Sequence, residues 1–243
     1  MKRWLAISII VVPLLAFFGM QSLMSQPQDE SSDETRGQFE ERYQALQEYL
    51  ASGEAGARDP LLTGKGIKLY WGIIKLGPPA LPYIIEKIEQ GDWRLGGCVL
   101  MISKKRFYRS DYADVRAYGD AITTAGMYVE WWHEGRKDTV EQFETLYQQW
   151  KDLRGQGQDE GAADKYERIR GLGIAALPYI IKKVEQGDVD LIPLVSRLTS
   201  GAGGAPDAIS STASAAECLD WWNKNKQRWT LPPVKSETVS STP

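Results

Sequence analysis

The chain contains very few of the residues that build metal and redox sites. Its 243 residues include one histidine, His133, and two cysteines, Cys98 and Cys218. A single imidazole cannot form a multi-histidine zinc site, and the two cysteines do not have the spacing of zinc ligands. We therefore predict no metal site and no cofactor, and we expect His133 to lie on a helix surface.

Phosphate-binding, nucleophile and nucleic-acid-binding patterns are also absent. No Gly-Lys-Ser/Thr occurs, and the glycines within 155–161 and 201–205 do not follow a predicted strand, as dinucleotide-binding glycines do. No Gly-x-Ser-x-Gly motif marks a catalytic serine. The formal net charge is −3, so the chain as a whole has no basic footprint for nucleic acid. We predict no catalytic residue and no nucleic-acid partner.

Sustained alternation of apolar and polar residues, which marks strands, is missing as well. Instead, one stretch occurs twice: residues 76–92 return as residues 172–188, with 13 of 17 positions identical. In the first copy Leu81, Ile84, Ile85 and Ile88 recur at helical spacing, which indicates one apolar face of an amphipathic helix. A fixed internal period of this kind predicts an all-α protein built by duplication.

Glycine, proline and aspartate punctuate both copies at matched positions. A proline falls in the first helical turn, where its missing N–H costs nothing. One glycine precedes it and another follows the helix, as left-handed caps do. The aspartate after the second glycine is placed to cap the next helix through its free N–H groups. These residues are Gly77, Pro82, Gly91 and Asp92 in the first copy and Gly173, Pro178, Gly187 and Asp188 in the second.

The duplication extends on both sides of this stretch. The offset falls from 104 to 96 to 90 along the chain, as expected when insertions and deletions collect in loops. Predicted helices cover about 33–49, 67–76, 95–102 and 127–136, besides the repeated one. Asp138 with Glu141, and Ser214 with Glu217, have the spacing of capping boxes. Outer matches pair Phe39, Tyr43, Leu46, Trp131 and Trp132 with Phe143, Tyr147, Trp150, Trp221 and Trp222.

The pattern Leu-Gly-x-x-Ala-Leu-Pro-x-Ile at 76–84 and 172–180, followed by Gly-Asp, resembles the HEAT-like helical repeats of bacterial proteins. The resemblance covers the two central helix pairs. It implies two tandem repeats, about 8–10 helices in all, forming a short curved solenoid-like domain. It also implies a binding or scaffolding role and no particular chemistry. The family usually continues with Val-Arg, whereas this chain has Arg94 near that place and 190–193 reads Asp-Leu-Ile-Pro.

The two cysteines leave a choice between a disulfide and free thiols. An exported chain permits a bridge, and the count is even. Cys98 and Cys218, however, occupy non-equivalent places in the two copies, each among apolar neighbours. Free cysteine packs as a small hydrophobe in such surroundings, so we expect two buried free thiols.

Residues 1–25 have the form of a signal peptide or signal anchor: a basic start and an apolar run interrupted by Pro13. The run is short for a membrane span, so cleavage and retention both stay open. Residues 26–36 are polar and acidic, which predicts a flexible tether. Copy one occupies 37–137, copy two 138–231, and a disordered tail 232–243. We expect an exported protein, periplasmic, extracellular or anchored facing outside, which meets the membrane only through its N-terminal segment.

Two long connections, 104–124 and 199–212, hold corresponding places in the copies. Loops longer than about 12 residues in compact domains are usually functional or disordered. Packing of the last helix of each copy against its repeat is the preferred explanation of the tryptophan pairs, since aromatic residues dominate core energetics. They are also binding candidates, because adjacent helix residues point about 100° apart, so one ring can enter the core while the other lies along a flank. The candidate binding residues are Arg106, Phe107, Tyr108, Arg109, Tyr112, Trp131, Trp132, Trp221 and Trp222.

These observations predict a non-catalytic, extracytoplasmic helical-repeat scaffold that binds a protein or peptide partner. One alternative is a carbohydrate- or cell-wall-binding module that uses exposed Trp and Tyr. A further alternative is a hydrolase with carboxylates in a groove, such as Asp188 with Asp190 or Glu130 with Glu134. A catalytic pair needs one carboxyl group in an apolar pocket, and we expect these residues to be caps and solvated side chains instead.

Overall fold

A computed structural model describes residues 30–53, 64–201 and 208–234. Within these ranges the chain is helical and contains no strand, which confirms the all-α class. None of the described helices is long and apolar enough to cross a bilayer. The predicted signal or anchor segment (1–25) and residues 235–243 of the predicted tail lie outside the described residues, as do 202–207 of the second long connection.

The first half begins with two helices, α1 (Glu30–Ala51) and α2 (Gly64–Ile74). A 3-10 turn η2 (Pro78–Ala80), helix α3 (Leu81–Glu89), a second 3-10 turn η3 (Trp93–Leu95) and helix α4 (Gly96–Ser103) follow. The first long connection contains the turns η4 (Arg109–Asp111) and η5 (Val115–Ala117). It ends at α5 (Ala121–Glu130), which runs into a π-helical turn, η6 (Trp131–Gly135).

The second half has the same order of main elements. Helices α6 (Thr139–Gly155) and α7 (Asp159–Gly171) are followed by η7 (Gly173–Ala176), α8 (Leu177–Glu185), η8 (Val189–Leu191) and α9 (Ile192–Thr199). Helix α10 (Ala215–Trp229) takes the place of α5. Pro82 and Pro178 lie in the first turns of α3 and α8, as predicted.

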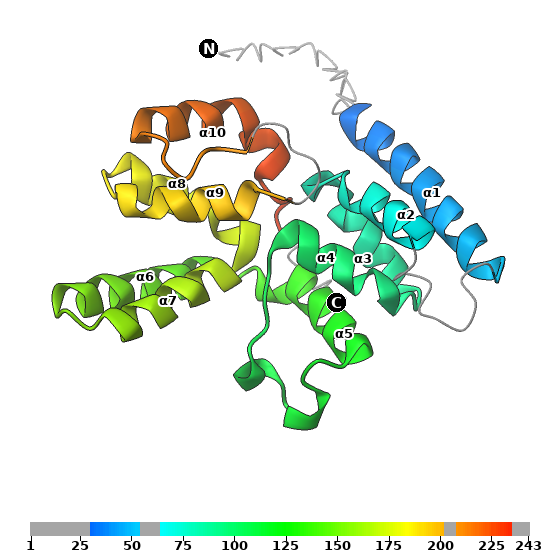
Figure 1. Ribbon diagram of the computed structural model, residues 1–243, viewed down its shortest axis with the longest axis horizontal. Coiled ribbons are helices and arrows are strands. Elements are labelled where there is room, and N and C mark those ends of the chain that lie inside the picture. Colours follow the sequence, from blue (N-terminus) through cyan, green and yellow to red (C-terminus); the bar gives the residue numbers. More distant parts are fainter. Residues whose placement is uncertain (1–29, 54–63, 202–207, 235–243) are drawn as a thin grey trace, which may run out of the picture.

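In Figure 1, α1 lies at one end of the molecule and the α6–α7 hairpin at the other. The segment between α4 and α5 extends away from the helices at the bottom of this view. Helix α10 packs against α8 and also against η2 of the first half. The buried apolar side chains form one continuous cluster that runs from Phe39 to Trp229, so the two halves share a core.

Matched positions in the two halves have matched surroundings. Ile84 and Ile180 are both fully buried. Phe39 stacks on Tyr43 with ring centroids 5.7 Å apart, and Phe143 stacks on Tyr147 at 5.8 Å. The apolar face predicted for the repeated helix is therefore the face that is buried in the core of each half, where it is removed from water.

The halves meet backbone to backbone at the start of η7. Gly173 has a φ of 72°, in the left-handed region, like its counterpart Gly77 at 74°, so both glycines end the preceding helix as predicted. A Cβ on Gly173 would lie 2.3 Å from the carbonyl oxygen of Ser103. Beside this contact the N–H of Arg106 donates to the carbonyl oxygen of Gly171 at 2.9 Å. This junction fixes where the first long connection leaves α4.

Three local predictions are wrong. Asp92 and Asp188 hold N-cap positions, but neither side chain makes a capping hydrogen bond; each turns instead toward the first helix of its half. Asp138 holds the N-cap position of α6, but its side chain makes no capping hydrogen bond. The tether prediction fails from residue 30 on, where α1 already begins. The box of Ser214 and Glu217 is confirmed.

Candidate functional site

The first long connection, residues 104–120, forms a pocket of about 880 Å³ together with η3, α4 and α5. Pockets of this size that are mostly apolar, with a few polar groups, are the usual places for ligands. The apolar and aromatic wall includes Trp93, Leu100, Phe107, Tyr112, Tyr118 and Tyr128. We call this cavity the connection pocket.

Three cations line the connection pocket, namely Arg94, Lys104 and Arg106. No carboxylate lines it. Among the described residues neither Lys104 nor Arg106 has an ion-pair partner, whereas Arg94 is paired with Asp92. Burial, and then the neighbouring charge of Arg106, lower the pKa of Lys104. Two unpaired positive charges beside apolar walls form a local excess of positive charge in a chain whose net charge is −3, and this favours an anionic group.

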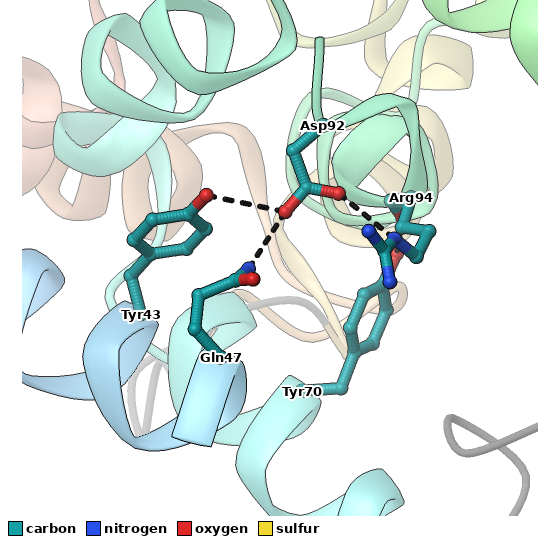
Figure 2. A network of polar contacts seen from close by, with 5 residues as sticks. All are labelled: Tyr43, Gln47, Tyr70, Asp92 and Arg94. Atoms are coloured by element: carbon teal, nitrogen blue, oxygen red, sulfur yellow. Dashed lines mark hydrogen bonds and ion pairs between the residues drawn. The ribbon is translucent and has the colours of Figure 1, made fainter. Parts of the chain in front are cut away.

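Arg94 is held in place by a network centred on the Asp92 carboxylate (Figure 2). Its Nε lies 3.1 Å from Asp92 Oδ1. The other carboxylate oxygen accepts hydrogen bonds from Tyr43 Oη at 3.2 Å and Gln47 Nε2 at 2.8 Å, both from α1. Tyr70 of α2 donates from Oη to the carbonyl oxygen of Arg94 at 3.1 Å. Side chains from α1 and α2 thus fix η3 at the edge of the pocket.

The beginning of the connection has an unusual backbone. Lys104 has a φ of 57° and is the one non-glycine residue in the left-handed region within the described ranges. Such a conformation costs about 1–2 kcal/mol for a residue with a Cβ, and it persists where surrounding structure enforces it. Here Lys104 ends α4, its N–H donates to the carbonyl oxygen of Leu100, and the junction with Gly173 lies against it. The junction therefore fixes the path that the chain takes from Lys104 to Arg106.

The aromatic wall is ordered by its own contacts. The rings of Phe107 and Tyr128 have centroids 5.0 Å apart, and Tyr128 Oη donates to the carbonyl oxygen of Lys105 at 3.2 Å. Tyr112 meets Tyr118 edge to face at 5.3 Å and shares a 2.9 Å hydrogen bond with Thr124 Oγ1. These contacts hold the connection on α5, so much of the wall is formed before any ligand arrives.

Large apolar side chains remain exposed at the rim of the connection pocket. Trp93 is 41% exposed, Leu100 39% and Tyr118 54%. Single exposed apolar residues are ordinary, but several gathered around one cavity indicate a contact surface. Together with the unpaired cations, they make this pocket the best candidate site in the described part of the chain.

The structure divides the residues predicted on the first connection. Arg106, Phe107 and Tyr112 line the connection pocket. Tyr108 instead packs on α7, where its Oη donates to the carbonyl oxygen of Glu167 at 2.7 Å, so it anchors the connection to the second half. Arg109 is exposed in η4 and does not line the pocket.

The expectation that one tryptophan of each pair is exposed is wrong. Trp131 and Trp132 are 4% and 7% exposed, and Trp221 and Trp222 are 8% and 9% exposed. The Arg136 guanidinium carbon lies 3.9 Å from the centroid of the Trp132 ring, and α10, which carries Trp221 and Trp222, packs against both α8 and η2. The pairs are core residues and provide no exposed aromatic platform.

A second pocket of about 570 Å³ contains the carboxylates of Asp111, Glu130, Glu134 and Asp138. All four side chains belong to exposed residues, and Glu134 pairs with Lys137. Carboxylates in water lack the apolar surroundings that give a general acid its proton at neutral pH. Within the described residues no group of three His, Cys, Asp or Glu is placed to hold a metal ion.

The other carboxylates considered from the sequence form structural contacts. Asp188 accepts hydrogen bonds from Tyr147 Oη at 2.7 Å and Lys151 Nζ at 3.1 Å. Partial burial alone would raise the pKa of Asp188, but these two hydrogen bonds and the Lys151 charge lower it. Asp190 pairs with Arg154. His133 is exposed, as predicted, and lies 2.6 Å from Glu89 Oε1.

The connection pocket belongs to the first half alone. At an offset of 96, the core positions agree: Leu95 and Val99 correspond to Leu191 and Val195, all buried. The pocket positions do not. Trp93, Arg94, Leu100 and Lys104 are replaced by Val189, Asp190, Ser196 and Ser200.

No protein-family model, curated protein or solved structure matches the chain.

Proposed function

We propose that the protein is a non-catalytic, extracytoplasmic helical-repeat scaffold that binds a protein or peptide segment in the connection pocket. The observation that supports this most directly is the gathering of exposed Trp93, Leu100 and Tyr118 around two cations without partners. Binding energy at peptide-binding surfaces is concentrated in a few large anchors of this type. The pocket walls hold no solvent-shielded carboxylate or nucleophile that would suit catalysis.

The repeat character of the proposal is supported by the matched order of elements and by matched contacts in the two halves. In stacked helical repeats, insertions collect on one face and often form the binding surface. The connection 104–120 is a long loop between α4 and α5. The extracytoplasmic location is supported by the basic and apolar N-terminal sequence.

Site-specific photo-crosslinking tests the proposal. A benzophenone side chain is placed at Tyr118, which is 54% exposed beside the pocket, or at Val189, which is 52% exposed in the second half. The full chain is irradiated in the native cell envelope, and crosslinked peptides are identified by mass spectrometry. We expect one defined partner segment at position 118 and none at 189. Equal labelling at both positions, or none at 118, would refute the proposal.

A carbohydrate- or cell-wall-binding role is the second candidate, favoured by the exposed rings of Trp93 and Tyr118. Aromatic faces are suitable surfaces for apolar faces of ligands. This role predicts that soluble wall fragments quench tryptophan fluorescence, and that Trp93→Ala abolishes the quenching. Protein crosslinks at position 118 without any such quenching would favour the peptide-binding role.

A further inference from the structure

The cations of the connection pocket are the feature that the general binding role leaves unexplained. Ion pairs neutralise some cations of the fold, as Lys87 with Glu40 and Lys183 with Glu144 in matched places. Lys104 and Arg106 are among the cations without such a partner in the described ranges, and both line a mostly apolar cavity. Lys104 is half-buried, and its burial together with the charge of Arg106 lowers its pKa, so the two like charges repel each other. A ligand carboxylate placed between them would relieve this repulsion.

From this charge complementarity we infer that the connection pocket recognises a peptide segment with a carboxylate next to a large apolar side chain. Lys104 and Arg106 bind the carboxylate, and the wall of Trp93, Leu100 and Tyr118 receives the apolar side chain. The inference rests on the proposed peptide-binding function and specifies its ligand. Because the two cations lie beside one apolar cavity, the ligand must carry its carboxylate and its large apolar side chain within a few residues of each other.

The shape of the site favours a short segment over an extended anionic surface. The connection carries five cations, Lys104, Lys105, Arg106, Arg109 and Arg116, and three exposed carboxylates, Asp111, Asp114 and Asp120. This charge attracts an acidic peptide and an anionic bilayer alike. The pocket, however, has a volume of about 880 Å³ and apolar walls. A peptide side chain can enter such a cavity, whereas a bilayer surface meets only its rim, so a peptide fits the pocket better than a lipid surface.

The second half supplies a matched comparison. The places of Trp93, Arg94 and Lys104 are held there by Val189, Asp190 and Ser200, and Asp190 is paired with Arg154. At these described positions the second half thus lacks the tryptophan and the charge of Lys104. If the inference is correct, acidic peptides bind the first half and leave the second half unoccupied.

A selection from random nine-residue peptides against the full chain tests the inference without assuming a sequence. We expect enriched peptides to place Asp, Glu or the free C-terminal carboxylate within a few residues of Phe, Leu or Trp. For one enriched peptide, replacing Glu by Gln, or the free C-terminus by an amide, identifies the carboxylate that the pocket binds. Affinity should fall at least tenfold, measured by calorimetry in low salt.

A charge-removal variant of the protein gives the complementary measurement. Lys104→Asn with Arg106→Gln removes both charges, and asparagine tolerates the left-handed backbone of position 104. Lys182→Asn with Lys226→Gln is the control, because these exposed lysines lie in the second half and the change in net charge is the same. The pocket variant should lose at least tenfold in affinity for the acidic peptide and retain its helical circular dichroism. The control should bind within twofold of wild type.

The outcomes separate the inference from the function on which it rests. If no peptide is enriched at all, the proposed function fails. Enriched peptides that lack a carboxylate, or that bind within twofold after Glu-to-Gln replacement, would overturn the inference and leave peptide binding intact. Sedimentation with phosphatidylglycerol vesicles that is lost in the pocket variant would assign the cations to a lipid surface and also overturn it.

Discussion

Replacing Gly173 by alanine should destabilise the protein much more than replacing Gly77, although the two glycines hold the same place in the repeated stretch. Their φ angles are nearly equal, at 72° and 74°. Their neighbours differ. A Cβ on Gly77 would meet Arg228 Nη2 at 3.1 Å, the far end of a flexible side chain. A Cβ on Gly173 would meet Ser103 O at 2.3 Å and Lys105 N at 2.6 Å, both of them backbone atoms.

The magnitudes follow from separate contributions. A left-handed alanine costs about 1–2 kcal/mol, and its lower entropy in the unfolded chain returns roughly 0.4–1 kcal/mol, so Gly77→Ala should cost about 1 kcal/mol. Gly173→Ala adds an overlap that the backbone must relieve by moving, which in packed interiors costs about 1–3 kcal/mol. It also strains the Arg106-to-Gly171 hydrogen bond, of about 1 kcal/mol. We expect a total on the order of 3–5 kcal/mol.

Urea unfolding followed by circular dichroism measures both variants, with Gly91→Ala as a third. Gly91 has a φ of 105° and open space around its Cβ direction, so it reports backbone strain alone. The reasoning requires that Gly173→Ala exceed both controls by at least 2 kcal/mol at an unchanged m-value. Equal costs for Gly173→Ala and Gly77→Ala would show that the halves do not meet at this backbone contact.

Three further predictions concern single groups. Burial, and next the neighbouring Asp92, raise the pKa of Tyr43 to about 12; the resulting stability is present below pH 10 and lost as pH rises from 10 to 12. Between pH 9 and pH 11.5 the free energy of unfolding in urea should fall by about 1 kcal/mol more for wild type than for Tyr43→Phe, a value reduced for solvent screening. Equal decreases for the two proteins would contradict this. Burial raises the pKa of Cys98 to about 12 and that of Cys218 above its ordinary value. Iodoacetamide should therefore label both thiols slowly in the folded protein and fully in urea without reductant. A chain without free thiols in urea would refute this. Ser214→Ala should cost about 1 kcal/mol in urea unfolding, and a cost below about 0.3 kcal/mol would show that the capping box is dispensable.

The sequence predicts the helical layout well because helix periodicity and glycine stops are local signals. The apolar stripe of α3 is buried as expected, and Gly77 and Gly173 adopt the left-handed conformation that ends a helix. The tether prediction (26–36) overlaps the first predicted helix (about 33–49), and α1 begins at Glu30, three residues earlier than that helix was predicted to begin. Gln38 bonds to Glu34 one turn away, and Arg36 lies over the Tyr83 ring of α3. A polar composition therefore does not exclude a helix here.

Local signals also fail when a tertiary partner competes for the same side chain. Asp92 and Asp188 stand where an N-cap residue belongs, yet tyrosine hydroxyls on α1 and α6 hydrogen-bond to both carboxylates. Conversely, the helix after the first long connection begins at Ala121, earlier than predicted, because Asp120 accepts a hydrogen bond from the Thr123 N–H. Capping chemistry was the correct principle, but its location depended on contacts that the sequence order does not reveal.

The candidate site could be predicted only in part. Arg106, Phe107 and Tyr112 were identified from the length of the connection alone. Trp93 and Leu100 are not among the predicted residues, since each lies in a short helix that looks structural. Lys104 lies at the start of the predicted connection but is not among the residues chosen from it. The tryptophan pairs attracted attention by their size, yet they are buried. One available signal was not used: the positions where two otherwise similar copies disagree.

That disagreement is the strongest argument for where function lies in this molecule. Where two similar halves pack in the same way, the buried positions should carry the same side chains. Leu95 and Leu191 correspond, as do Val99 and Val195, and all four are buried. Packing does not explain why a cation without an ion-pair partner, Lys104, lies beside the pocket where the second half has Ser200. The strained turn is fixed from the second half, through Gly173, so one half constrains the backbone of the pocket while the other supplies its walls. Movement at this junction should therefore change ligand binding even when every pocket residue is intact, and Gly173→Ala should weaken binding of an acidic peptide more than Gly77→Ala does.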